Sequence, residues 1–346
     1  MRLGYHTGYW SAGPPPGAAE AVQAADRLGL DSVWTAEAYG SDAFTPLAWW
    51  GATTSRVRLG TAVAQIAART PTATAMAALT LDHLSGGRFT LGLGVSGPQV
   101  VEGWYGLPYP RPLARTREFV AIVRDVLRRE GPVRAGGPFY RLPLPDDEGS
   151  GLGKALRSTV HPLRADLPIH LAAEGPKNIA LAAEIADGWL PLFYTPRLDD
   201  EFRGLLAEGF DRRLAGTRPV EEFEVTATVP VVLGADVESA ADAVRPFVAL
   251  YAGGMGAKGA NFHANALARL GYAEACAEIQ AHWSAGDRAR AAAAVPTELV
   301  QDVALVGTPD EVRAQAAAWR DTAVTTLLIQ AAPDQLPDIA ALLADV

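Results

Sequence analysis

The sequence predicts an α/β protein, a (β/α)8 TIM barrel with insertions, on the basis of two observations. Eight short runs of apolar and β-branched residues alternate with longer segments in which apolar residues recur at helical spacing. Each short run is followed by a helical segment, which is typical of parallel strands that close into a barrel rather than of two doubly wound domains. We therefore expect a single barrel domain over residues 1–346, with insertions at about 131–167 and 253–305.

The first half of the chain supplies four of the eight units. Gly29 and Gly86 stop the first and third helical patterns, since glycine readily adopts the left-handed conformation that ends a helix. In the fourth helical pattern, Phe119, Ile122 and Val126 fall on one face, which predicts that this face packs on the sheet. The predicted strands are residues 2–5, 32–35, 57–63 and 88–93, and the predicted helices are residues 18–28, 44–54, 72–84 and 115–129.

The second half of the chain is less regular. Residues 131–167 are rich in glycine and proline, which predicts a functional loop without a core of its own. Substrate specificity is expected in this loop and in residues 253–261. The predicted strands are residues 168–171, 188–190, 224–233 and 325–329, and the predicted helices are residues 177–186, 199–214, 235–251, 336–343 and a long helical stretch from 253 to about 306.

Composition and charge exclude several functional classes. Of the 346 residues, 49% are hydrophobic and 20% are charged, as in an ordinary globular protein. A net charge of −9 without any basic run argues against a nucleic-acid partner, and no stretch approaches the ~20 apolar residues of a membrane span. The single Cys276 and the scattered histidines predict no metal site. No apolar signal segment opens the sequence, so a cytoplasmic location is expected.

Chemistry in such barrels takes place at the carboxyl ends of the strands, where His6, Glu37 and Asp42 are expected. Histidine is the usual acid or base near neutral pH, so His6 is the candidate catalytic residue, with core packing as the alternative. The sequence contains no hydrolase elbow, kinase set or P-loop. We therefore expect a cofactor that carries its own chemistry.

A glycine-rich segment follows the fourth predicted strand. Residues 92–97 match the G-x-G-x-x-G pattern of dinucleotide-binding proteins. Pro98 and the prolines after it predict no helix there, which argues against that interpretation. In a barrel loop, Gly94, Ser96 and Gly97 would instead let the backbone approach a ligand.

The loop after the fifth predicted strand precedes a helix start. Backbone amides at a helix N-terminus suit a phosphate, and Lys177 adds a positive charge. An ordinary turn with a helix cap is the alternative. The loop consists of Ala172, Ala173, Glu174, Gly175, Pro176, Lys177 and Asn178.

Several segments together resemble the luciferase-like monooxygenase superfamily, and within it the branch that uses coenzyme F420, a 5-deazaflavin. The resemblance runs nearly end to end. The parts most specific to that branch are Leu-Ser-Gly-Gly-Arg at 84–88 together with Gly-Pro-Lys-Asn at 175–178. The other matching segments are residues 32–43, 58–61, 69–71, 81–89, 91–94, 186–189 and 306–309.

The resemblance implies an F420-dependent oxidoreductase that transfers a hydride between the deazaflavin C5 and a small organic substrate. The reaction would oxidise an alcohol or reduce an activated double bond or an imine. An FMN-dependent monooxygenase and a non-catalytic F420-binding protein are alternatives. The family also implies a homodimer or higher homo-oligomer and a cis peptide at Ala62–Val63. The implied cofactor-binding residues are Glu37, Thr61, Ala62, Val63, Gln65, Gly94, Ser96, Gly97 and the loop 172–178.

The chain departs from the family at two proton-handling positions. Ala38 and Gly97 stand where several relatives carry histidine and glutamate. These departures argue against a sugar-phosphate dehydrogenase and leave His6 as the predicted acid or base.

Overall fold

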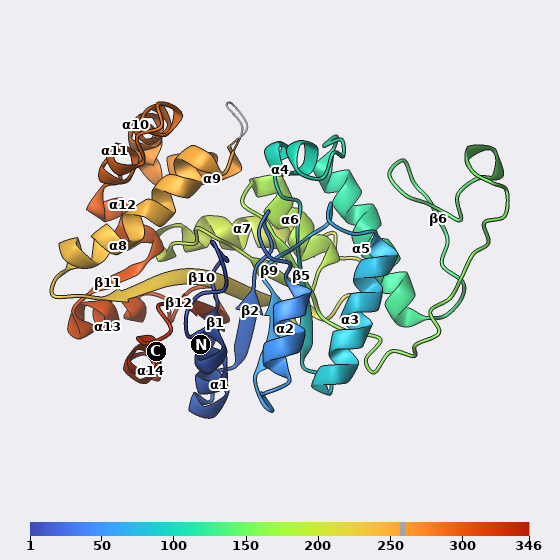
Figure 1. Ribbon diagram of the computed structural model, residues 1–346, viewed down its shortest axis with the longest axis horizontal. Coiled ribbons are helices and arrows are strands. Elements are labelled where there is room, and N and C mark those ends of the chain that lie inside the picture. The colour runs from blue at the N-terminus through green and yellow to red at the C-terminus, as the bar shows by residue number, and fades with distance from the viewer. Residues whose placement is uncertain (257–260, 346) are drawn as a thin grey trace.

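The computed structural model, shown in Figure 1, describes residues 1–256 and 261–345. Within these residues eight parallel strands close into one barrel, because β12 pairs with β1 and β9 pairs with β10. The (β/α)8 barrel predicted from the sequence is therefore confirmed. The barrel strands are β1 (Arg2–His6), β2 (Ser32–Thr35), β3 (Arg58–Thr61), β5 (Phe89–Gly94), β8 (Ile169–Ala172), β9 (Gly188–Leu190), β10 (Glu224–Leu233) and β12 (Thr326–Gln330).

Helices surround the barrel on its outer side (Figure 1). Gly29 and Gly86 end α1 and α3 with φ angles of 78° and 68°, which is the left-handed conformation expected of them. The helices between barrel strands are α1 (Ala18–Leu28), α2 (Phe44–Gly51), α3 (Pro71–Ser85), α5 (Pro112–Arg128), α6 (Pro176–Ile185), α7 (Asp199–Phe210) and α8 (Val237–Ala249), and α14 (Leu336–Leu342) follows the last strand.

The third predicted strand, residues 57–63, is shorter in the structure. β3 ends at Thr61, and the peptide bond between Ala62 and Val63 is cis, as the resemblance implied. The chain resumes as β4 (Ala64–Gln65), which pairs with β5. The segment that the sequence analysis placed in one continuous strand is therefore interrupted just before the barrel mouth.

The single helical stretch predicted from 253 to about 306 is wrong. Gly271 and Gly286 have φ angles of 102° and 81°, which interrupt a regular helix. Residues 257–260 of this predicted insertion lie outside the described residues. The elements formed are the π-helical turns η4 (Leu250–Gly254) and η5 (Ala268–Tyr272), the helices α9 (Phe262–Leu267), α10 (Ala273–Ser284), α11 (Arg288–Ala293) and α12 (Thr297–Val303), then β11 (Leu305–Gly307) and α13 (Pro309–Ala317).

Residues 131–167, here called the arm, extend away from the barrel (Figure 1). The arm contains a short hairpin of β6 (Ala135–Gly136) and β7 (Arg141–Leu142) and the 3₁₀ turn η1 (Asp146–Glu148). Its returning limb is held to the barrel helices by hydrogen bonds. His83 Nε2 is joined to the His161 carbonyl over 2.7 Å, Arg129 Nε donates to the Ser158 carbonyl over 2.8 Å, and Arg164 pairs with Asp82 of α3.

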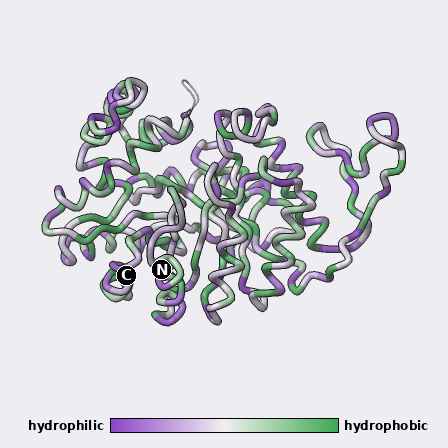
Figure 2. The backbone as a smooth tube through the Cα atoms, viewed as in Figure 1, coloured by the Kyte–Doolittle hydropathy of each residue, from purple (hydrophilic) through white to green (hydrophobic). Residues whose placement is uncertain are grey.

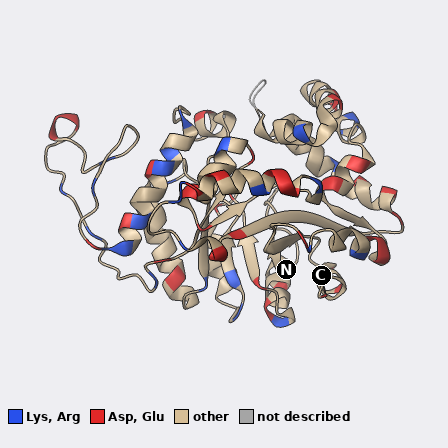
Figure 3. Ribbon diagram, turned by 180° about the vertical axis from the view of Figure 1, so that it is seen from behind, with Lys and Arg blue, Asp and Glu red and all other residues tan. Residues whose placement is uncertain are grey.

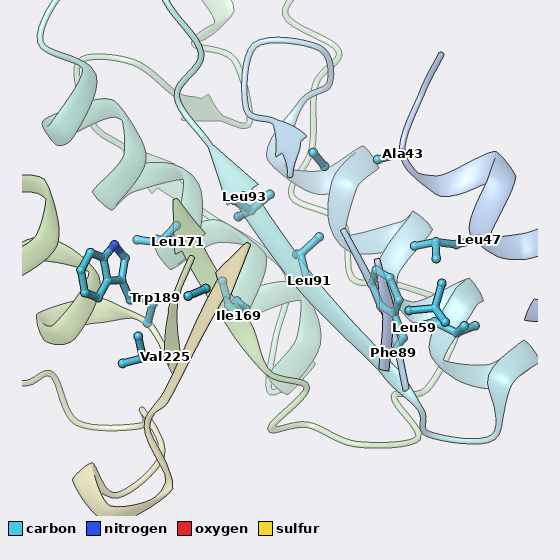
Figure 4. Packing of buried hydrophobic residues seen from close by; sticks show 14 of the residues in the cluster. Ala43, Leu47, Leu59, Phe89, Leu91, Leu93, Ile169, Leu171, Trp189 and Val225 are labelled. Atoms are coloured by element: carbon cyan, nitrogen blue, oxygen red, sulfur yellow. The ribbon is translucent and has the colours of Figure 1, made fainter. Parts of the chain in front are cut away.

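The main hydrophobic core lies between the strands and the surrounding helices. Figure 4 shows Leu47 of α2 beside Leu59 and Phe89 of two neighbouring strands, all at most 2% exposed. Hydrophobic residues follow the strands (Figure 2), while charged residues lie mostly on the outer helices (Figure 3). In the described part of the chain no helix is both long and apolar enough to cross a membrane.

Candidate active site

A cavity of about 1370 Å³ lies at the carboxyl ends of the barrel strands, flanked by α4 (Pro98–Gly103) and α9. Its walls come from the ends of six barrel strands and the loops that follow them, from Thr228 of β10 and from the segment around α9. Most of the lining side chains are apolar or aromatic, which suits an organic ligand. The lining residues include Tyr9, Glu37, Ala38, Tyr39, Ala62, Val63, Gln65, Gly94, Ser96, Gly97, Trp104, Tyr109, Leu113, the loop 172–178, Leu190, Tyr251, Met255, Phe262 and His263.

Most of the residues predicted to bind a cofactor line this cavity. They are Glu37, Ala62, Val63, Gln65, Gly94, Ser96, Gly97 and all seven residues of the loop 172–178. Thr61 and His6 do not line it. The structure thus brings together segments from four strand ends, while the binding role of these residues stays a prediction.

Thr61 joins two strands beneath the cavity. Its hydroxyl donates to the Gly92 carbonyl over 2.7 Å and accepts from the Gly92 amide over 2.9 Å. Because both bonds run to the neighbouring strand, the side chain holds β3 against β5 rather than facing a ligand.

His6 is 5% exposed, and both of its ring nitrogens are engaged. Nδ1 accepts from the Gly8 amide over 3.0 Å, so Nε2 carries the proton and donates to the Ala62 carbonyl over 3.3 Å. Burial lowers the pKa of His6 to about 4, which keeps the ring neutral. The geometry supports the packing alternative for His6, because the ring positions backbone beneath the cavity wall and leaves no nitrogen for a substrate.

Glu37 organises one edge of the cavity mouth. Its carboxylate accepts from Arg69 Nη1 over 2.8 Å and from the Gln65 amide over 2.8 Å, so its burial is compensated. The Gln65 side-chain amide donates to the Ala38 carbonyl over 2.8 Å. Among the described residues, Oε1 of Gln65 is buried without a hydrogen-bond partner, so a ligand could donate to it.

The glycine-rich segment at the end of β5 forms the cavity wall next to that edge, because β4 pairs with β5 there. A Cβ on Gly94 would lie 2.4 Å from Val63 Cγ2, so only glycine fits beside that side chain. The prediction that no helix follows Gly97 is wrong. α4 begins at Pro98, because proline at the first helical position loses no hydrogen bond. With six residues, α4 is too short for a dinucleotide-binding helix.

The loop 172–178 ends at the N-terminus of α6. Gly175 is the N-cap residue, with φ −84° and no side-chain hydrogen bond, and its carbonyl accepts from the Asn178 and Ile179 amides. Space around Gly175 is open, since a Cβ there would meet no atom within 4 Å. The helix start therefore presents backbone N–H groups to the cavity without a competing side-chain cap.

A polar cluster that the sequence analysis missed lies on the other side of this loop. Nδ1 of His263 is 2.6 Å from Oε1 of Glu174. The His263 ring packs edge-on against Tyr251 at 4.8 Å, and the hydroxyl groups of Tyr9 and Tyr251 neighbour each other. Burial raises the pKa of both tyrosines, so both phenols stay protonated at neutral pH. No local sequence signal pairs His263 with Glu174, because 89 residues separate them.

Comparison with known families agrees with this arrangement. A family model described as luciferase-like monooxygenase matches residues 3–326. The chain belongs to the luciferase-like monooxygenase family. It is therefore an enzyme of this superfamily, as the sequence resemblance implied. In the described part of this luciferase-like chain, no three His, Cys, Asp or Glu residues gather as metal ligands would.

Two relatives of this luciferase-like chain are informative. A protein of Mycobacterium tuberculosis, provisionally named a coenzyme F420-dependent oxidoreductase, is 57% identical over 343 residues, covering 99% of each chain. A 5,10-methylenetetrahydromethanopterin reductase of Methanolobus tindarius is 28% identical over 307 residues, covering 88% of this chain and 86% of that protein.

A solved structure supports the luciferase-like fold independently. The coenzyme F420-dependent tetrahydromethanopterin reductase of Methanopyrus kandleri superposes with a TM-score of 0.80. At 23% identity, it covers 100% of this chain and 97% of that one. This likeness establishes the barrel and its connections.

Proposed function

We propose that this protein is an F420-dependent oxidoreductase that transfers a hydride between the deazaflavin C5 and a small organic substrate. The substrate is an alcohol, or an activated double bond or imine in the reductive direction. The observation that carries the proposal is the large, mainly apolar cavity at the strand mouths, which has an uncapped helix N-terminus at one side. The relative that is 57% identical over nearly the whole chain supports the choice of cofactor.

The cavity floor suits a flat ring. Ala62, Val63 and Ala172 present small apolar side chains above a buried layer that contains Trp34 and Leu190. The unpaired Oε1 of Gln65 offers an acceptor for a ring N–H. These residues would hold the deazaflavin, which supplies two-electron hydride transfer when bound.

The phosphate of the cofactor would lie at the start of α6. The N–H groups of Gly175 and Lys177 are available there, together with the positive end of the helix dipole. The Glu174 carboxylate would repel a phosphate, but it is directed to His263 and is hydrogen bonded there. The loop can therefore contain an acid and still bind an anion.

The cofactor assignment is tested by direct binding. F420 fluorescence should be quenched at micromolar protein or below, equivalent to about −8 kcal/mol. Gly175→Pro should weaken binding by about 1–3 kcal/mol, because it removes one N–H while the φ of −84° already suits proline. Gly175→Ala, which keeps the N–H, is the matched control. Tight binding of FMN without any binding of F420 would contradict the proposal.

We also propose that the protein forms a homodimer or higher homo-oligomer. Trp49 on α2 and Met76 and Leu84 on α3 are 77%, 62% and 74% exposed, which is unusual for such large apolar side chains. Sedimentation velocity measures the oligomeric state directly, and a monomer at high micromolar concentration would contradict this proposal.

A further inference from the structure

The cavity contains one imidazole, that of His263, among the side chains that line it. The other candidate proton carriers are occupied or too weakly acidic. Glu37 is neutralised by Arg69, and burial raises the pKa of Tyr109 to about 12. Among the described residues that line the cavity, the only side chain whose ordinary pKa lies near neutrality is therefore His263, which α9 brings over the cavity.

The hydrogen bond to Glu174 decides which nitrogen of His263 is available. A carboxylate accepts, so Nδ1 carries the proton in the neutral ring and Nε2 keeps its lone pair. Within residues 1–256 and 261–345, Nε2 has no hydrogen-bond partner. A substrate hydroxyl can therefore donate to Nε2 without displacing any described protein contact.

The surroundings fix this orientation. Arg269 donates to the backbone carbonyl of Glu174, which holds the loop against the helical segment that carries His263. Tyr251 and Phe193 pack edge-on against the imidazole at 4.8 and 6.2 Å. The charged and titratable groups near the ring are thus one carboxylate, two protonated phenols on Tyr9 and Tyr251, and a guanidinium directed at backbone.

We propose that His263, oriented by Glu174, is the general base and acid of this enzyme, and that its substrate is an alcohol with a hydrophobic body or the matching carbonyl compound. This inference rests on the proposed function. In the oxidative direction, the hydroxyl proton moves to Nε2 of His263 as the carbon–oxygen double bond forms. The hydride from the same carbon reduces the oxidised deazaflavin, and the imidazolium stays paired with the Glu174 carboxylate.

The walls near His263 favour a hydrophobic alcohol over a charged one. Phe262 and Met255 lie close to His263 in the chain, and Trp104 and Leu113 also line the cavity. Trp104 is 65% exposed and Phe262 is 44% exposed, so both rings are accessible to a ligand. Such surfaces bind the apolar body of an alcohol and leave its hydroxyl for the imidazole.

The test compares His263→Gln and Glu174→Gln with His282→Gln, a control on α10 whose ring is outside the cavity. Single-turnover reduction of F420 by propan-2-ol and longer secondary alcohols measures hydride transfer, and fluorescence quenching measures F420 affinity. His263→Gln should slow hydride transfer about 10²- to 10⁴-fold and abolish its pH dependence near neutrality, while the dissociation constant changes less than about 2-fold. The control should behave as the unmodified enzyme.

A second readout does not depend on turnover. The 15N chemical shifts of the His263 ring should show the proton on Nδ1 in the unmodified protein, and this preference should weaken in Glu174→Gln, because a neutral amide oxygen is a weaker acceptor than a carboxylate. An unchanged tautomer preference in Glu174→Gln, or an unchanged rate in His263→Gln, would overturn the inference while F420 binding remains. Failure to oxidise any of the alcohols, or to reduce their carbonyl products, overturns the substrate class. Loss of F420 binding in the unmodified protein would instead overturn the proposed function.

Discussion

The two long excursions from the barrel differ in what they bury. The arm, residues 131–167, exposes large apolar side chains, with Leu152 and Leu156 at 85% and 67% exposure. Residues 250–303, here called the second insertion, pack with α8 in a hydrophobic cluster that includes Ile279 and Leu299, both fully buried. The arm contributes no residue to the cavity, whereas the second insertion contributes His263 and the aromatic wall beside it.

This difference corrects an expectation from composition. The glycine- and proline-rich arm was expected to be a functional loop that sets specificity, but it lies away from the cavity. The second insertion can present His263 over the cavity because its buried side chains pack η4, α11 and α12 against α8, while α9 and α10 pack on η4. A polar side chain reaches a defined position only where the element that carries it is itself held by packing.

The largest expected effect comes from removing part of the core in the second insertion. Ile279→Ala should lower the free energy of unfolding by about 2–5 kcal/mol, because Ile279 is 0% exposed and its truncation leaves a cavity. Leu152→Ala in the arm is the matched control and should change stability by less than about 0.5 kcal/mol. Denaturant unfolding measures both, and equal losses would remove the distinction between the two excursions.

Acid should weaken the barrel rather than the second insertion. Among the described residues, the two histidines below 9% exposure, His6 and His170, lie on barrel strands, and burial lowers the pKa of each to about 4. The folded protein therefore binds fewer protons than the unfolded chain between pH 6.5 and 4, so stability falls as the pH falls through that window.

Each buried imidazole should cost about 2 kcal/mol of stability between pH 7 and pH 5. The His6→Gln variant should show a correspondingly smaller loss over that interval in denaturant unfolding. His282→Gln, on the second insertion, should retain the full loss. An identical pH dependence in all three proteins would show that His6 titrates normally.

A smaller effect is expected from the side chain that ties the second insertion to α8. Arg245 donates to the Val295 carbonyl over 3.0 Å and to the Thr297 hydroxyl over 2.7 Å, and it is 9% exposed. Arg245→Met should lower stability by about 1–3 kcal/mol, because a buried carbonyl loses its donor. Arg141→Met, which breaks the exposed ion pair with Glu148 in the arm, should cost at most about 1 kcal/mol. A larger loss of stability in Arg141→Met than in Arg245→Met would show that the arm is held more tightly than the second insertion.

Local patterns were sufficient to predict the barrel and part of the cavity lining. The alternation of strands and helices determines the fold, and a loop between a strand and a helix start identified residues 172–178. The direction in which a side chain points at the end of a strand depends on tertiary packing as well as on local sequence. His6 was therefore expected to line the cavity, and it instead lies beneath the cavity wall. The pairing of His263 with Glu174 depends on how the second insertion packs, which the sequence pattern of that region does not encode.

The ten residues of β10 anchor both ends of the second insertion. The earlier part of β10 belongs to the barrel, and residues 231–233 pair with β11, where the chain returns from the second insertion. The chain therefore leaves β10 into α8 and, after the second insertion, returns as β11 to pair with the same strand. Both ends of the second insertion are therefore fixed to the same barrel strand, which limits where α9 and His263 can lie over the cavity.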